Sequence, residues 1–162
     1  MNYAELHCLS NFTFLRGASH AEELAERAHE LGYAALAITD ECSMAGVVRA
    51  HMAAKKCGLK LIIGSEIRFT DGPSIVLLAT DRTGYGNLSE LISQGRRNAI
   101  KGSYSLAFSD IQNGLPGCLA LLLPDPLPTL EQAQQVAAAF PNSSWLAVEL
   151  FRAADDAELS AR

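Results

Sequence analysis

The 162-residue sequence lacks several features that would place it in a familiar class at once. It has no run of 18 apolar residues, so no transmembrane helix is expected. The first ten residues lack the basic start of a secretory signal, which favours a cytoplasmic protein without a membrane partner. No GxGxxG, GxxxxGKS or GxxxxGKT sequence follows a candidate strand, so the usual dinucleotide and P-loop phosphate sites are excluded.

Positive charge is also scarce. There are 13 Lys and Arg residues against 18 Asp and Glu, for a net charge of −5. Because unspecific binding to a phosphate backbone requires positive surface, the chain is not expected to bind DNA as a whole. We interpret the small basic cluster of Arg96, Arg97 and Lys101 as a solvated helix C-terminus, where the helix dipole favours cations. The alternative is a contact with DNA or with another domain.

The four cysteines, Cys8, Cys42, Cys57 and Cys118, include no CxxC pair. This spacing excludes zinc ribbons and thioredoxin-like redox sites. We therefore expect four reduced thiols, two or three of them buried as small apolar side chains.

Apolar runs of strand length alternate with amphipathic stretches of helix length. Strands are expected at 3–9, 34–38, 61–69, 74–78, 118–123 and 145–150, and helices at 20–31, 43–57, from about 81, at 130–140 and in the last dozen residues. A single helical turn is expected at 109–113. This alternation predicts an α/β fold with a largely parallel sheet, either a barrel or an open doubly wound sheet.

Individual residues add detail to the prediction of an α/β fold. Ser19 and Glu22 have the spacing of a capping box at the start of the first helix. Leu31 and Tyr85 are expected on buried helix faces, and Trp145 in the core.

Functional side chains of α/β folds gather at the carboxyl ends of strands. The polar residues expected at those ends are His7, Ser10, Arg16, Asp40, Glu41, Glu66 and Glu149. If the histidine and the four carboxylates converge, they would suit Mn, Mg or Zn. If they do not converge, they are ordinary helix caps and surface charges. Their spacing in the sequence alone does not decide between these two interpretations.

Several motifs, in order along the chain, resemble those of PHP domains (polymerase and histidinol phosphatase) in bacterial C-family DNA polymerases. They are residues 5–10 (ELHCLS) with 14–17 (FLRG), 37–40 (AITD), 61–66 (LIIGSE), 77–79 with 84–88 and 91–93, and 145–152 around Glu149. Two segments are most similar to the error-prone branch of these polymerases: residues 5–19 (ELHCLSNFTFLRGAS) and 35–51 (ALAITDECSMAGVVRAH).

The resemblance implies a PHP-type distorted (β/α)7 barrel, here truncated after about six strands. Residues 1–162 would be the N-terminal part of a PHP domain, with the polymerase domains and the last PHP motif absent from this chain. The parent would be a DNA-directed DNA polymerase, a nucleotidyltransferase that uses Mg and acts in translesion synthesis, DNA repair and DNA replication after DNA damage. This fragment itself is not expected to be an enzyme.

The sequence departs from the family at the metal site. Ligands are lost at Leu9, Arg16, Glu41 and Ser74, while His7, Asp40, Glu66 and Glu149 remain as vestigial positions. Leucine has no lone pair to offer, and a guanidinium stays charged and cannot ligate a cation. We therefore expect no bound metal, no cofactor and no catalytic residue in this chain.

Arg16 suggests a more specific hypothesis. If its side chain enters the pocket that holds the metals in metal-bearing PHP domains, it can bind Glu41, Glu66 and Glu149 by charge-assisted hydrogen bonds in place of metal bonds. The alternative is that Arg16 points to solvent and the carboxylates cap neighbouring helices.

The resemblance thus favours a structural or interaction domain. Its expected partners are the remaining polymerase domains and accessory mutagenesis proteins, with DNA reached only through the parent, and an open sheet edge would permit self-association. The alternative is an active metal-dependent phosphoesterase or 3′–5′ exonuclease on nucleotide or DNA ends. That enzyme would hold Mn or Zn with His7, Asp40, Glu66 and Glu149.

Overall fold

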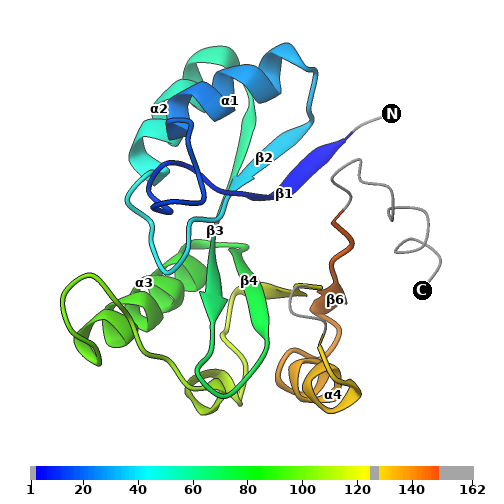
Figure 1. Ribbon diagram of the computed structural model, residues 1–162. Coiled ribbons are helices and arrows are strands. Elements are labelled where there is room, and N and C mark those ends of the chain that lie inside the picture. The colour runs from blue at the N-terminus through cyan, green and yellow to red at the C-terminus, as the bar shows by residue number, and fades with distance from the viewer. Residues whose placement is uncertain (1–2, 125–127, 150–162) are drawn as a thin grey trace, which may run out of the picture.

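The computed structural model describes residues 3–124 and 128–149, which form one six-stranded sheet with helices around it (Figure 1). The sheet runs in sequence order through β1 (Ala4–Cys8), β2 (Ala35–Ile38), β3 (Lys60–Arg68), β4 (Ser74–Ala79), β5 (Cys118–Leu122) and β6 (Ser144–Leu146). The helices are α1 (Ala21–Glu30), α2 (Val47–Cys57), α3 (Arg82–Arg97), the 3₁₀ helix η1 (Phe108–Ile111) and α4 (Leu130–Ala139).

The sheet is mixed but largely parallel, as expected, with one reversed strand at its centre. β1, β2 and β3 are parallel, as are β5 and β6, but β4 is antiparallel to both β3 and β5. β3 and β4 are joined by a short turn at Asp71–Gly72, which only antiparallel strands permit. After α3 the chain returns to the end of β4 that it left, where the Thr80 amide donates to the Gly117 carbonyl at 2.8 Å.

Helices cover the two halves of the sheet separately. α1 and α2 bury small side chains, including Ala25 and Ala50, against β2. α3 and η1 pack on the β3–β5 half around Leu88, Leu106 and Ile111. The other face of the sheet carries a third cluster around Val76 and Leu121. The α/β expectation is confirmed, and the curled sheet of six strands fits a truncated, distorted barrel.

Several local predictions are wrong. α1 is capped one residue later than expected, because the Glu23 carboxylate, not that of Glu22, accepts the His20 amide at 2.8 Å. Leu31 lies just beyond the helix and is exposed, and Tyr85 sits on an exposed position of α3. Trp145 is also exposed, because β6 is a short strand at the edge of the sheet whose one partner among the described strands is β5.

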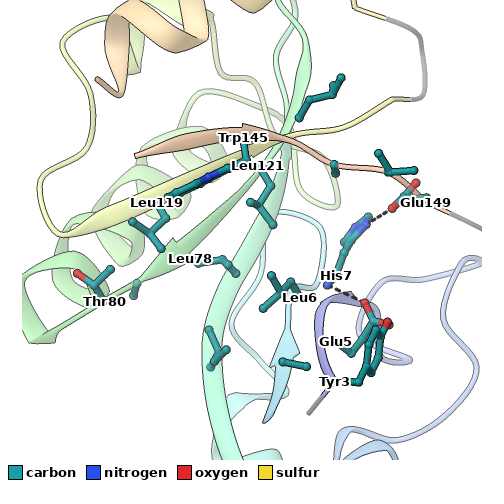
Figure 2. A pocket seen from close by; sticks show the side chains of 16 residues that line it. Tyr3, Glu5, Leu6, His7, Leu78, Thr80, Leu119, Leu121, Trp145 and Glu149 are labelled. Carbon is teal, nitrogen blue, oxygen red and sulfur yellow. Dashed lines mark hydrogen bonds and ion pairs between the residues drawn. The ribbon is translucent and has the colours of Figure 1, made fainter. Parts of the chain in front are cut away.

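The curl of the sheet brings β1 close to the segment that follows β6. Between them lies a largely apolar cavity of about 760 Å³, with Leu6, Leu78, Leu121 and Trp145 among its lining residues (Figure 2). Its rim is crossed by a contact between His7 and Glu149. The last helix expected from the sequence lies outside the described residues. Within the part that is described, no helix is long and apolar enough to cross a membrane.

All four cysteines carry free thiols. Cys42 and Cys118 are buried, and burial raises the pKa of each thiol to about 11. The expectation of reduced thiols with two of them buried is confirmed.

Candidate functional site

The loop that follows β1 is organised by one buried carboxylate, that of Asp40 at the end of β2. Asp40 accepts hydrogen bonds from the Ser10 amide at 2.8 Å, the Ser10 hydroxyl at 2.7 Å and the Thr13 hydroxyl at 2.7 Å. Gly17 lies against the Ser10 carbonyl, where an added Cβ would come within 2.0 Å of the oxygen. Asp40 therefore shapes the loop backbone, and its side-chain bonds go to that loop rather than to the ionic residues described next.

The same loop places Arg16 over the end of β3. A turn in which the Arg16 amide donates to the Thr13 carbonyl at 3.1 Å directs the side chain back toward the sheet. Its Nη1 donates to Glu66 at 2.7 Å and to Glu41 at 2.8 Å, and its Nη2 donates to Glu66 at 3.0 Å. The two bonds to Glu66 form a bidentate pair, the strongest arrangement between these groups. The structure does not pair Arg16 with Glu149.

Glu66 is the buried centre of this arrangement, with a fully inaccessible side chain (0% exposed). Its Oε1 accepts from Arg16 and from the Arg68 Nε at 2.8 Å, and its Oε2 accepts from Arg16 and faces the His7 Nε2 at 2.9 Å. Burial alone would raise the pKa of Glu66, but the hydrogen bonds from His7, Arg16 and Arg68 lower it to about 2. Glu66 is thus an ionised carboxylate with four close polar contacts.

His7 links Glu66 to the far end of the described chain. Its Nε2 faces Glu66, and its Nδ1 contacts the Glu149 carboxylate that follows β6 (Figure 2). Burial lowers the pKa of His7, but the hydrogen bonds to Glu149 and Glu66 outweigh this effect and raise it to about 9. A protonated imidazole donates from both nitrogens and has no lone pair left for a metal.

Two further residues, Arg68 and Tyr104, contact Glu66 or Glu41 and were not predicted from the sequence. Arg68 donates to Glu66 and lies 3.8 Å from Glu41. The Tyr104 hydroxyl donates to Glu41 at 2.9 Å and accepts the Arg68 amide at 3.1 Å. Arg68 follows Glu66 by two residues on one strand, so the period of a strand could have placed them on the same face. Tyr104 lies in an irregular segment and carries no such signal.

The basic residues at the end of α3, Arg96, Arg97 and Lys101, are exposed, as expected for a solvated helix C-terminus, and Arg96 makes an additional contact with the rest of the fold. Arg96 donates to the Cys42 carbonyl at 2.9 Å and lies over the Tyr104 ring. Arg97 pairs with Glu90 on its own helix at 2.8 Å.

We define the ionic cluster as His7, Arg16, Glu41, Glu66, Arg68 and Glu149. Three of these side chains are cations when His7 is protonated and three are carboxylates, so their formal charges cancel. Coulomb attraction at such distances is strong where water is excluded. The arrangement can therefore hold five segments of the chain together: β1, the loop after it, the segment after β2, β3 and the segment after β6.

The residues do not fit a metal cluster. Both oxygens of Glu66 already accept from guanidinium groups, and a divalent cation there would face Arg16 and Arg68 directly. Leu9 offers no lone pair, and Ser74 is buried opposite Arg68 in the β3–β4 ladder. Within residues 3–124 and 128–149, no group of three or more His, Cys, Asp or Glu side chains is arranged to hold a metal ion.

The comparison with protein families decides the relationship, since residues 5–124 match the PHP domain family. The chain belongs to this family. This PHP domain is 57% identical over 161 residues to an error-prone DNA polymerase of Dechloromonas aromatica, covering 96% of this chain and 16% of that relative. It is 58% identical over 154 residues to an error-prone DNA polymerase of Pseudomonas aeruginosa, covering 95% of this chain and 15% of that relative. The chain thus spans about one sixth of the length of these polymerases.

Solved structures agree on the fold of the PHP domain. A protein described as a metal-dependent phosphoesterase from Bifidobacterium adolescentis superposes with a TM-score of 0.67 at 16% identity, covering 85% of this chain and 74% of that one. An amidohydrolase from Chromobacterium violaceum, with bound sulfate and no metal, has a TM-score of 0.50 at 28% identity, covering 59% of this chain and 34% of that one.

Proposed function

We propose that this PHP domain is a structural module of an error-prone, C-family DNA polymerase that works without a metal of its own. In the proposal, Arg16 and Arg68 supply the positive charge that a metal would otherwise bring to the pocket. The phosphoesterase or exonuclease chemistry of a metal-bearing PHP domain is then absent, and polymerisation with Mg belongs to other domains of the parent.

The proposal rests on one observation: both oxygens of the Glu66 carboxylate already have hydrogen-bond partners. A carboxylate that is fully buried needs compensating charge, since an unpaired buried charge destabilises a fold by several kcal/mol. Here two guanidinium groups and one imidazole supply it. A divalent cation could bind Glu66 only by displacing these partners, and both arginines would remain nearby as like charges.

The partners proposed for the domain follow from its place in a longer polypeptide. The remaining polymerase domains are the first of them, and accessory mutagenesis proteins are a second class. Among the described residues no further strand pairs with the outer edges of β1 and β6, which supports the proposal of self-association, because open strand edges pair readily with other chains.

An assay of 3′-end hydrolysis tests the proposal. The intact polymerase carrying this domain is incubated with single-stranded DNA and with a phosphodiester model substrate, in Mn or in Zn, beside its Glu66→Gln variant. We expect no hydrolysis that depends on Glu66, and a lower melting temperature of the variant. Hydrolysis that disappears specifically with Glu66→Gln, in a variant shown to be folded, would favour the phosphoesterase alternative.

A further inference from the structure

The loop after β1 displays two large apolar side chains to solvent. Phe14 is 83% exposed and Leu15 is 90% exposed. Leu15 also has a φ of +66°, a left-handed conformation that is strained for a bulky L-residue. The fold gains little from a leucine at this position, since the side chain is almost fully in water. Strain kept at an exposed apolar tip is a pointer to recognition.

The tip is held rigidly although it is exposed. The Thr13 carbonyl accepts both the Arg16 amide at 3.1 Å and the Gly17 amide at 2.9 Å, which closes a tight turn around Phe14 and Leu15. The Thr13 hydroxyl is bound to Asp40, as described above. An anchor that is already ordered loses little conformational entropy on binding, which is how preorganised contacts gain affinity.

A groove of about 430 Å³ adjoins this tip. Its lining includes Phe12 and Phe14 of this loop together with Glu41, Arg96 and Tyr104. Exposed aromatic side chains beside an arginine are the composition that protein interfaces favour at their centres.

Arg96 and Glu41 both line the groove, but the Glu41 carboxylate is already paired with Arg16 at 2.8 Å, which leaves a local excess of positive charge. Arg96 and Lys101 have no carboxylate within ion-pair distance among the described residues, whereas the charges of the ionic cluster cancel. This local excess contrasts with the net charge of −5 of the whole chain. An occupant with apolar side chains flanked by Asp or Glu would complement both properties of the groove.

We propose that the tip, Phe14 and Leu15, and the adjoining groove form a docking surface for an apolar, acid-flanked segment in the rest of the same polymerase polypeptide. The inference rests on the proposed function, which makes this domain part of a longer chain. The length of the relatives supports an intramolecular occupant, because about five sixths of their sequence lies outside the part that matches. That remainder is tethered to the domain, which raises its effective concentration at the groove.

Photocrosslinking in the intact polymerase tests the docking surface. Phe14→p-benzoylphenylalanine places a crosslinker at the tip, and Val48→p-benzoylphenylalanine is the matched control, since Val48 is a largely exposed apolar residue on α2. After irradiation at low protein concentration, crosslinked peptides are mapped by mass spectrometry. We expect an intramolecular crosslink from position 14 to one segment beyond residue 162 that carries apolar and acidic residues, at least tenfold above the control.

The remaining outcomes contradict the inference. A yield equal to that of the Val48 control, a crosslink only to residues 1–162, or a crosslink to a second copy or another protein would each overturn it. Primer extension by the same preparations reports on the proposed function separately. An active polymerase without the crosslink would thus reject the docking surface alone, whereas a polypeptide without polymerase activity would reject the proposed function.

Discussion

The guanidinium of Arg16 forms a bidentate pair with the carboxylate of Glu66, at 2.7 and 3.0 Å, over the end of β3. The pair joins a loop at the start of the chain to a strand 50 residues later. Because the Glu66 side chain is fully buried and that of Arg16 is only 34% exposed, solvent screens the pair much less than a surface salt bridge.

Removal of the Arg16 side chain should destabilise the domain. Arg16→Ala leaves Glu66 buried with fewer partners, and we expect a loss of about 2–3 kcal/mol, below the value for a completely buried pair because Arg16 is partly solvated. Arg27→Ala is the control, since Arg27 pairs with Glu30 on the surface and should matter by about 0.5 kcal/mol or less. Urea unfolding of both variants checks this, and equal losses would show that the Arg16 pair contributes no more than a surface one.

His7 should make stability fall as the pH rises. Its pKa is about 9 in the folded domain against an ordinary 6.5, so the folded state holds the proton more tightly. The resulting stabilisation, of the order of 2–3 kcal/mol, is complete below about pH 6.5 and is lost progressively up to about pH 9. Unfolding free energies measured from pH 6 to 9.5 should show this slope, and His7→Gln should flatten it. A slope that persists unchanged in His7→Gln would assign it to other groups.

Glu66 acts in the opposite pH range. Its pKa of about 2 lies below the ordinary 4.5, so its contribution is present above about pH 4.5 and lost as the pH falls toward 2. Together with His7, this predicts that the cluster stabilises the domain most between about pH 4.5 and 6.5. A stability maximum above pH 8 would contradict the predicted charge state of the cluster.

Asp40 should behave as a loop anchor. Three donors converge on its carboxylate, so Asp40→Asn turns an acceptor into a donor that faces other donors, at an expected loss of about 1–3 kcal/mol. Glu26→Gln is the matched control, because Glu26 is exposed and lies 4.0 Å from its lysine partner. Thermal melts of the two variants test this role. If the melting temperatures of Asp40→Asn and Glu26→Gln fall by the same small amount, Asp40 does not anchor the loop.

Replacement of Leu15 by glycine should stabilise the domain. Leu15→Gly removes the strain of a left-handed leucine, and after the entropy that glycine costs in the unfolded chain we expect a gain of about 0.5 kcal/mol. Leu31→Gly is the control, since Leu31 is also exposed but has a φ of −77°, and it should lose about 0.5–1 kcal/mol. If both substitutions destabilise equally, Leu15 is not strained in solution.

The sequence indicated the α/β layout because apolar runs such as 34–38, which contains the buried strand β2, alternate with amphipathic helices of clear periodicity. The Asp71–Gly72 dipeptide signals an antiparallel turn between β3 and β4, but the pairing of β5 with β4 after the long return through α3 depends on tertiary packing. The exposure of Trp145 likewise depends on what lies beside an edge strand, which no local pattern records.

The candidate site was foreseeable only in part. Positions at strand ends pointed to His7, Glu66 and Glu149, but spacing cannot say which charges meet. The separation of Asp40 from the cluster arises from hydrogen bonds to Ser10 and Thr13, which compete for its carboxylate. Tyr104 reaches the site through an irregular loop, and only three-dimensional structure reveals such a contact.

The central claim is that the ionic cluster neutralises itself and leaves no place for a metal. The most direct test is elemental analysis of the domain purified without chelator, followed by titration with Mn and Zn and measurement of the melting temperature. Because a ligand of the native state raises stability by mass action, even micromolar binding would be visible. We predict less than about 0.1 equivalent of bound metal, which is the level of adventitious contamination, and an unchanged melting temperature. One or more equivalents of tightly bound metal, with a raised melting temperature, would contradict it.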